Sequence, residues 1–373
     1  METENEAPRA YNRGIFSSLG GAKSAEAEGR YSSSALQSRS SAEEDKRILI
    51  TGGAGFVGHH CVEHILKNTN WKIIVLDSLN YAGNMNRITD IATFKPERVS
   101  FVWHDLKAPI SETTSKLIGE LDYCIHFAAE SHVDRSLEDC VPFVYSNVLG
   151  TANLLEYLKH HQSQCHTLIF STDEVFGPAP EGVYYKEDDS FRPSNPYAAS
   201  KAGEEMIAFS FAHAFGLPIS IVRSMNIIGE RQHPEKFVPK TIKTILDNEK
   251  IILHGKTRND LSSRCWIHAR NVADGLLFLL DKAKKEDFYH IVGEERTVLE
   301  IADWICEEIK GRKLNDNEIQ FLDYHTARPG HDKRYALSGE KLAKIGWKPP
   351  VDLEESIKKT VKWSLENKKW LNL

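Results

Sequence analysis

The sequence predicts an α/β protein in which a doubly wound parallel sheet is followed by a smaller C-terminal domain. Three observations support this prediction. Unbroken apolar runs alternate with helically periodic stretches, a glycine-rich turn follows the first run, and from about residue 223 the rhythm gives way to loops and prolines. Strand, helix and strand at such spacing form parallel βαβ units.

The expected strands of the sheet are short apolar runs without strict alternation. This pattern is typical of strands that are buried on both faces, as they are in a parallel sheet. Between them, apolar residues recur at helical spacing. The strands are expected at 46–50, 72–76, 99–103, 123–127, 167–170 and 219–222, and the helices include 59–67 and 143–160.

The chain divides into three parts by composition. Residues 1–45 are rich in Ser, Ala, Glu and Arg, and they bury too little apolar surface to offset the entropic cost of ordering. We therefore expect a disordered leader there. Residues 46–222 form the expected sheet domain, to which a segment near 265–292 returns, and 223–373 mainly form the smaller domain.

Composition and charge exclude several classes of protein. Of the 373 residues 41% are apolar, 47 are Lys or Arg and 53 are Asp or Glu, which gives a formal net charge of −6. Such a chain lacks the basic surface that nucleic-acid binding requires, and no apolar run is long enough for a membrane span. The six scattered cysteines show no zinc spacing. With no secretory signal, they predict a cytoplasmic protein without a metal site.

A glycine-rich turn, Thr51 to Gly58, lies between the first expected strand and the first expected helix. Gly52 permits the sharp turn, Gly55 lets a pyrophosphate approach the backbone, and Gly58 allows helix and strand to pack closely. The open N–H groups at the start of the helix then bind the pyrophosphate. The turn predicts a Rossmann-type dinucleotide site.

Two acids at strand ends specify the dinucleotide. Asp77 ends the second expected strand, 19 residues after Gly58. A carboxylate there accepts hydrogen bonds from both ribose hydroxyls and repels a 2′-phosphate, which favours NAD over NADP. Asp105, at the end of the third strand, is placed to receive the adenine amino group. We therefore expect NAD as the cofactor.

A tyrosine and a lysine, Tyr197 and Lys201, open an expected helix after Pro196. Residues four apart share a helical face, so the phenol and the ammonium are expected to lie side by side. The positive charge is expected to lower the pKa of Tyr197 toward working pH. Tyr197 then becomes a base that removes a hydroxyl proton while hydride leaves the same carbon.

A hydroxyl and two carboxyls, Thr172, Asp173 and Glu174, directly follow the expected strand 167–170. Open α/β sheets place their chemistry at this end of a parallel strand. Neighbouring carboxyls push their pKa values apart, so that one is a protonated acid while the other is a base. An acid that releases a hydroxyl and a base that takes a carbon-bound proton together predict elimination of water.

With these motifs the sequence resembles the extended short-chain dehydrogenase/reductases that act on nucleotide sugars, and among them the dTDP-glucose 4,6-dehydratases. The acid pair Asp173-Glu174 carries the narrower resemblance, because related epimerases typically have small or hydroxyl residues there. Further matching segments are 128–136, 234–236 and 328–332. The resemblance runs from about Arg47 to the end of the chain.

The resemblance implies a reaction cycle. In it, Thr172 holds the sugar 4-hydroxyl and Tyr197 removes its proton while the C4 hydride passes to NAD. Glu174 removes the proton on C5, Asp173 protonates the departing C6 hydroxyl, and hydride returns to C6. The product is a 4-keto-6-deoxy sugar, NAD is tightly held and regenerated in each turnover, and Lys201 bridges the nicotinamide ribose.

The resemblance also implies an NAD-binding domain at 46–222 and a mainly nucleotide-sugar-binding domain at 223–373. The residues implied for NAD are Gly52, Gly55, Phe56, Val57, Gly58, Asp77, Ser78, Leu79, Asn80, Asp105, Leu106, Phe127, Ala128, Ala129, Ser131, Tyr197 and Lys201. Those implied for a nucleoside-diphosphate glucose are Ser131, Thr172, Asn226, Lys236, Arg264, Arg328 and His331. Arginine is suited to this task because its guanidinium matches phosphate oxygens.

Departures from the family pattern fall in the nucleotide-binding half. Residues 226–230 read Asn-Ile-Ile-Gly-Glu where the family usually has Asn-Asn-Tyr-Gly-Pro, and Cys265 stands where an Asp usually follows Arg264. They leave the base of the donor open: dTDP-glucose is favoured, and UDP-glucose of a rhamnose route is the alternative. A sugar-nucleotide 4-epimerase and a non-catalytic dinucleotide sensor are weaker alternatives, because neither needs the acid pair.

Two expected helices, 143–160 and 197–215, are apolar around much of their circumference. Such helices are either deeply buried in one chain or paired with a second copy. The resemblance favours the second arrangement, a homodimer.

Overall fold

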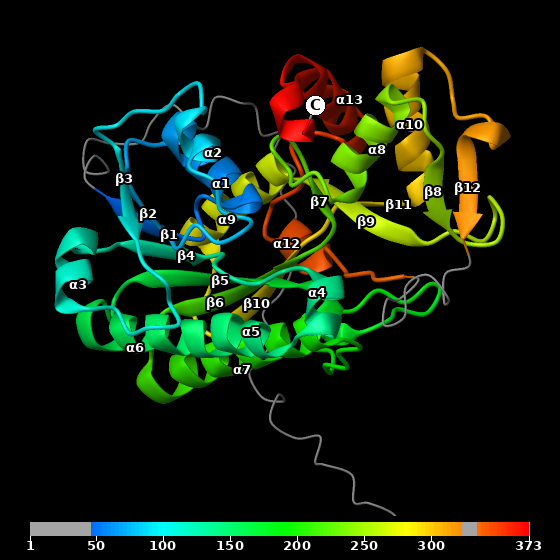
Figure 1. Ribbon diagram of the computed structural model, residues 1–373. Coiled ribbons are helices and arrows are strands. Elements are labelled where there is room, and N and C mark those ends of the chain that lie inside the picture. Colours follow the sequence, from blue (N-terminus) through cyan, green and yellow to red (C-terminus); the bar gives the residue numbers. More distant parts are fainter. Residues whose placement is uncertain (1–45, 323–333, 373) are drawn as a thin grey trace, which may run out of the picture. The chain divides into compact units, whose positions relative to one another are not determined.

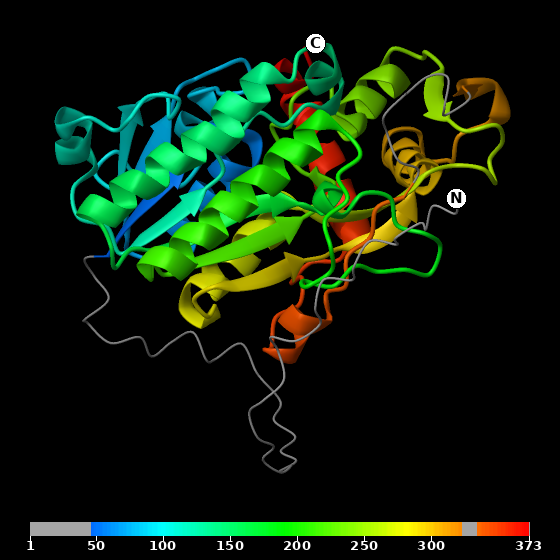
Figure 2. The same cartoon turned by 90° about the horizontal axis from the view of Figure 1, so that it is seen from below.

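A seven-stranded parallel sheet forms the centre of the structure (Figures 1 and 2). The computed structural model describes residues 46–322 and 334–372, so the predicted leader at 1–45 lies outside the described residues. The strand order is β10-β6-β5-β4-β1-β2-β3, and every neighbouring pair is parallel. The direction of winding reverses at β1, which confirms the predicted doubly wound α/β fold.

The first six strands lie where the apolar runs predict them. They are β1 (Arg47–Thr51), β2 (Lys72–Asp77), β3 (Val99–Trp103), β4 (Tyr123–His126), β5 (His166–Thr172) and β6 (Ile219–Ser224). The seventh, β10 (Asp287–Ile291), comes from the C-terminal half and pairs with β6. The chain therefore returns to the sheet late, while the domain boundaries expected from the sequence stay a prediction.

Helices cover both faces of the sheet. Ile48 and Ile50 of β1 belong to the core under α1 (Phe56–Asn68) and α9 (Ala269–Lys282). Leu49 belongs to the core under α6 (Gly150–His161) and α7 (Pro196–Phe215), which lie side by side in Figure 2. Because successive side chains of a strand point to opposite faces, two covered faces require an unbroken apolar run.

Short helical segments connect these elements. They are α2 (Asn86–Thr89), α3 (Glu112–Ile118), α4 (Val133–Glu138), α5 (Val141–Phe143), the π-helical turn η2 (Val144–Leu149) and the 3₁₀ turn η3 (Asp173–Phe176). The predicted helix 143–160 is thus formed by η2 and α6. The π turn buries Asn147, which hydrogen-bonds both backbone groups of Glu130 and the Ser200 hydroxyl of α7. Asn147 thereby ties the loop after β4 to α7.

The C-terminal half has its own core and two small sheets. Its strands are β7 (Ile227–Ile228), β8 (Ile251–His254), β9 (Ser263–His268), β11 (Glu294–Thr297) and β12 (Ile319–Leu322), ordered β11-β9-β7 and β12-β8. Its helices are α8 (Phe237–Leu246), α10 (Val298–Lys310), η4 (Asp316–Glu318), α12 (Glu340–Lys344), α13 (Leu353–Glu366) and η5 (Lys368–Leu371). Within 46–322 and 334–372, no helix is long and apolar enough to cross a membrane.

The two ends of α7 are fixed by local signals. The Asn195 side chain accepts a hydrogen bond from the Ala198 N–H, Pro196 occupies the first helical position, and Gly216 ends the helix with a left-handed backbone at φ 68°. Asparagine caps, first-turn prolines and left-handed glycines are typical helix boundaries. They place Tyr197 in the first turn, where it faces the end of β5.

Candidate active site

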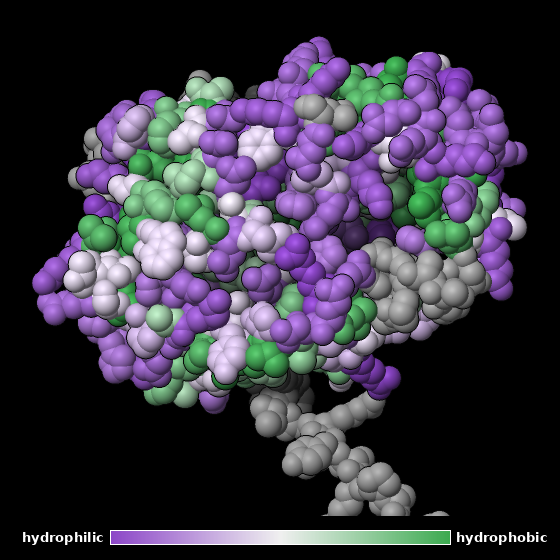
Figure 3. Space-filling view, viewed as in Figure 1, coloured by the Kyte–Doolittle hydropathy of each residue, from purple (hydrophilic) through white to green (hydrophobic). Residues whose placement is uncertain are grey.

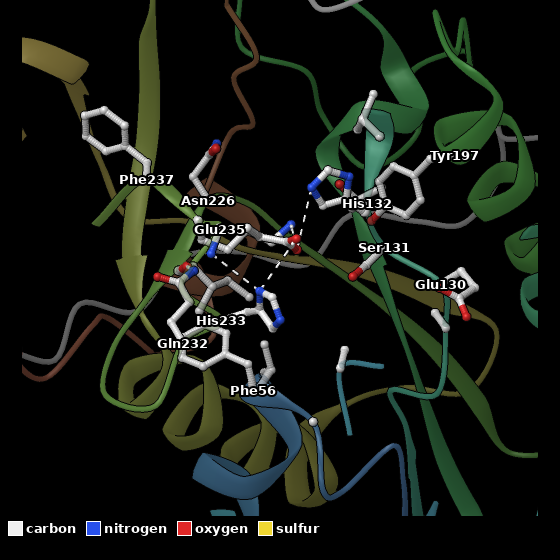
Figure 4. Close-up of a pocket in the computed structure, with 18 of the residues that line it drawn as sticks. Phe56, Glu130, Ser131, His132, Tyr197, Asn226, Gln232, His233, Glu235 and Phe237 are labelled. Atoms are coloured by element: carbon white, nitrogen blue, oxygen red, sulfur yellow. Dashed lines mark hydrogen bonds and ion pairs between the residues drawn. The ribbon is translucent and has the colours of Figure 1, made fainter. Parts of the chain in front are cut away.

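A pocket of about 1160 Å³ lies at the carboxyl ends of the parallel strands, with the C-terminal half on its other side. Figure 3 shows the surface hollowed among hydrophilic residues on this face. In Figure 4, Phe56 of α1, Tyr197 of α7 and Asn226 of the C-terminal half face the same space. Of the predicted site residues that the structure describes, all but Leu79 line this pocket. Arg328 and His331 lie outside the described residues.

The glycine turn provides a close-fitting cradle at the start of α1. Gly52 has φ +66°, and a Cβ there would lie 2.7 Å from the Ala128 backbone nitrogen. A Cβ at Gly58 would lie 2.4 Å from the Gly52 carbonyl oxygen. The first-turn N–H groups of α1 begin at Phe56, after the N-cap Gly55, and the turn carries no acidic side chain. A cradle with open N–H groups and no negative charge fits the pyrophosphate of a dinucleotide.

Asp77 holds the far side of this cradle. Its Oδ2 accepts a 3.0 Å hydrogen bond from the Ala54 N–H and its Oδ1 a 2.8 Å bond from the Leu79 N–H. Burial raises the pKa of Asp77, and these two bonds act in the opposite direction. Leu79, which does not line the pocket, therefore shapes it through its backbone. Asp105 lines the pocket beside Lys107, whose Nζ lies 3.1 Å from Oδ2 of Asp105.

Thr172 and Asp173 form the inner end of the pocket. The Thr172 hydroxyl donates to Oδ1 of Asp173 at 3.0 Å, and it caps η3 by accepting from the Glu174 N–H. Asp173 is buried, and its Oδ2 has no hydrogen-bond partner among the described residues. Burial, and then the charge of Glu174, raise the pKa of Asp173 to about 7. A protonated acid beside a second carboxyl is the arrangement that elimination of water requires.

Two residues that the sequence did not single out hold Glu174. Oε2 of Glu174 accepts a 3.0 Å hydrogen bond from Nδ2 of Asn195 and a 3.5 Å bond from the Tyr335 hydroxyl. Asn195 is the residue that caps α7, so a single side chain orients both Glu174 and the helix of Tyr197. Tyr335 is 161 residues away from Glu174 in the sequence, so only the tertiary structure shows their contact.

Tyr197 is buried, and the predicted lowering of its pKa is wrong for the protein without cofactor. Burial first, and then the charge of Glu174, raise the pKa of Tyr197 above its usual range, while a hydrogen bond with Thr172 acts in the opposite direction. The prediction counted only the neighbouring lysine. It left out the desolvation of the phenol and the carboxylates that face it.

Lys201 has different partners from those that helical spacing predicts. Its Nζ donates to the Phe170 carbonyl oxygen at 2.8 Å and to Oε2 of Glu204 at 2.5 Å. Both residues of the pair are buried. The lysine charge is therefore balanced by a carboxylate on its own helix and not by the Tyr197 phenol.

Glu235 points into the pocket between histidine side chains in Figure 4. Oxygens of Glu235 lie 3.6 Å from Nε2 of His132, 3.6 Å from Nδ1 of His233 and 3.8 Å from Nζ of Lys236. His132 follows β4 and the other three precede α8, so this group joins the two halves of the chain. Nowhere in the described ranges do three or more His, Cys, Asp and Glu side chains form a group that could hold a metal ion.

Three of the predicted substrate residues, Asn226, Lys236 and Arg264, come from separate segments of the C-terminal half. Asn226 has φ 24°, a strained backbone for a residue with a side chain. The guanidinium of Arg264 lies 5.2 Å from the Tyr335 ring centre, and its Nη1 donates to the Ser263 carbonyl oxygen. Together with Lys236 these residues line the pocket opposite the glycine cradle. Their contacts with a substrate stay a prediction.

The fold and this pocket define a class of nucleotide-sugar enzyme. The model of the GDP-mannose 4,6 dehydratase family matches residues 49–360, and the chain belongs to this family. This finding confirms the resemblance inferred from the motifs of the sequence.

Particular members narrow the class. A human dTDP-D-glucose 4,6-dehydratase is 34% identical over 335 residues, covering 88% of this chain and 93% of its own length. The structure of a dTDP-glucose 4,6-dehydratase from Streptomyces venezuelae with NAD and TYD bound has a TM-score of 0.78 and 33% identity, covering 87% of this chain and 98% of that one.

Two further similar proteins bear on the alternatives. A trifunctional Arabidopsis thaliana protein that includes a UDP-glucose 4,6-dehydratase is 33% identical over 87% of this chain and 48% of its own length. A Thermus thermophilus UDP-glucose 4-epimerase structure with NAD has a TM-score of 0.74 and 30% identity, covering 85% of this chain and 98% of that one. The fold alone therefore does not separate dehydration from epimerisation.

Proposed function

We propose that the chain is an NAD-dependent hydro-lyase that converts a nucleoside-diphosphate glucose, dTDP-glucose in first place, into its 4-keto-6-deoxy sugar. The observation that carries this proposal is the buried acid pair at the end of β5. Asp173, with a pKa of about 7, and Glu174 lie next to Thr172 and Tyr197 in one pocket. An epimerase needs no acid and base at this place.

In the proposed reaction three side chains of the protein, Tyr197, Glu174 and Asp173, move protons. Tyr197 removes the proton of the sugar 4-hydroxyl, which Thr172 orients by a hydrogen bond. Glu174, held by Asn195 and Tyr335, removes the proton on C5, and Asp173 donates a proton to the departing C6 oxygen, which leaves as water. Glu174 then returns a proton to C5 as hydride is delivered to C6. When bound, the cofactor NAD would supply the acceptor of the hydride from C4 and, in its reduced form, the donor of that hydride to C6.

The base of the donor is the finer part of the proposal. The human and Streptomyces relatives named above support dTDP-glucose, and the Arabidopsis relative keeps UDP-glucose as the alternative. Purified protein is incubated separately with each donor, without added reductant, and the 4-keto-6-deoxy product is assayed. We expect kcat/KM for dTDP-glucose to exceed that for UDP-glucose by about tenfold or more, since a methyl group in a fitted pocket discriminates to this extent.

Two other outcomes of this assay would change the proposal. A preference for UDP-glucose would assign the chain to the rhamnose-route alternative. A sugar epimerised at C4, with no dehydrated product from either donor, would contradict the reaction itself.

We also propose that the chain forms a homodimer in the cytoplasm. The six free cysteines agree with a reducing compartment. Large apolar side chains are exposed on the outer side of α5, η2 and α7, as in Val144, Tyr145 and Met206, which are 52%, 53% and 46% exposed. In Figure 1 these segments lie next to one another. A second copy of the chain is the natural cover for them, because isologous pairing of one such face forms a closed dimer.

Charge placed on this face is expected to separate the dimer. In Tyr145→Glu/Met206→Glu, two carboxylates on each copy would face those of the other copy, so the mass measured by light scattering should fall to that of one chain. Ile345→Glu, at an exposed apolar residue that follows α12, is the control and should remain dimeric. A wild-type protein that is already monomeric would refute the proposal.

A further inference from the structure

A buried carboxylate that the proposed reaction does not use lies one turn after Lys201 on α7. Glu204 is fully buried, and its Oε2 accepts the 2.5 Å hydrogen bond from Nζ of Lys201. Its other oxygen, Oε1, has no hydrogen-bond partner within the described part of the chain. Burying a carboxylate costs free energy, so its place beside the candidate catalytic groups points to a role in function.

The amine of Lys201 is held by two acceptors. One is the Phe170 carbonyl oxygen at the end of β5 and the other is Glu204. An ammonium has three N–H donors, so one remains for the pocket that Lys201 lines. The two acceptors therefore fix the direction in which the third N–H points.

Ionisable groups from four elements surround this pair. They are Tyr197 and Glu205 on α7, His126 on β4, Asp173 and Glu174 on η3, and Arg223 on β6, which pairs with Glu205. Burial, and then the charge of Lys201, lower the pKa of His126 to about 3, so this histidine is neutral. Arg223 pairs with Glu205, and Lys201 pairs with Glu204.

The charge of Glu204 also reaches Tyr197. After burial and Glu174, the charges of Asp173 and Glu204 further raise the pKa of the phenol. By pairing with Lys201, ionised Glu204 also offsets the positive charge that would favour the phenolate form of Tyr197. Burial raises the pKa of Glu204 itself to about 7, so its charge is present mainly above that pH.

We propose that Glu204 is a positioning residue that orients the Lys201 amine and, when ionised, opposes deprotonation of Tyr197. This inference rests on the proposed function, in which Tyr197 is the base of the first step. On this proposal, the charge of Glu204 sets the pH above which Tyr197 acts as the base for C4 oxidation.

The test is the pH profile of Glu204→Gln, which keeps an acceptor for Lys201 and removes the charge. We expect the rising limb of kcat/KM to move to lower pH by about one unit, which is about a tenfold gain over wild type on that limb. Glu204→Asp retains the charge and should keep the wild-type limb. The double variant Arg223→Met/Glu205→Leu is the control, because it removes the neighbouring buried carboxylate, which pairs with Arg223 and not with Lys201, without leaving its partner unpaired.

A limb that stays in place, or a loss of activity by the same factor at every pH, would show that Glu204 is only structural and overturn the proposal. If Glu204→Gln does not fold, Glu204→Ala removes the same charge and must give the same displacement. Wild type without dehydratase activity toward either donor would instead refute the proposed function, so the two failures are distinguishable.

A second readout needs no substrate. The folded-state pKa of Glu204 lies above that of an unfolded glutamate, so its ionisation lowers stability as pH rises through the interval between them. With both proteins saturated with NAD, Tm of Glu204→Gln minus Tm of wild type should therefore increase from about pH 5 to about pH 8. A difference that does not change with pH would mean that Glu204 never carries charge in the folded protein, which also overturns the proposal.

Discussion

Glu174→Gln is expected to slow formation of the 4-keto-6-deoxy sugar strongly while leaving oxidation at C4 in place. Glutamine keeps an oxygen that accepts from Asn195 and Tyr335, so the site retains its shape, but it does not remove the proton on C5. Loss of a general base of this kind lowers the rate by about 10²- to 10⁴-fold. We expect product formation to fall by this factor, and absorbance of reduced nicotinamide to accumulate on the enzyme after substrate is added.

Asp173→Asn is the matched comparison for this variant. It removes the proton donor for the C6 oxygen and leaves the base at Glu174, so the C5 proton should still exchange with deuterium from the solvent although no product forms. In Glu174→Gln that exchange should stop. Product formed by Glu174→Gln at near the wild-type rate, or exchange that continues in it, would contradict the role assigned to Glu174.

The sheet could be predicted because a strand that is buried on both faces has an unbroken run of apolar residues. Each of β1 to β6 is an apolar run that packs under helices on both sides, and β5 adds the polar end Ser171-Thr172 where the sheet meets the pocket. The two glycines with close backbone neighbours, Gly52 and Gly58, were readable for the same reason, since only glycine fits there.

The electrostatics of the site could not be predicted from spacing. Two residues four apart on a helix are neighbours, yet Lys201 bonds Glu204 and the end of β5, and Tyr197 is desolvated among carboxylates. Asn195 and Tyr335 were missed for a related reason. Their hydrogen bonds to Glu174 span 21 and 161 residues of the chain, and no local pattern encodes contacts of that kind.

The largest effect on stability is expected from Arg223→Met. Arg223 on β6 is the largest fully buried side chain of the described residues. Its guanidinium donates to both oxygens of Glu205 at 2.7–3.0 Å and lies within 4.8–5.1 Å of the ring centres of Phe176, Phe191 and Phe288. Methionine fills the aromatic space but leaves Glu205 buried and unpaired, which costs about 3–5 kcal/mol of unfolding free energy. Denaturant unfolding of NAD-saturated protein measures this loss.

The double variant Arg223→Met/Glu205→Leu distinguishes the cost of leaving Glu205 unpaired from the cost of losing the Arg223 side chain. With neither charge present, no ion is left unpaired in the core, and stability should return to within about 1–2 kcal/mol of wild type. A double variant as unstable as the single one would mean that the guanidinium stabilises the core through its packing between the rings and not through the charge of Glu205.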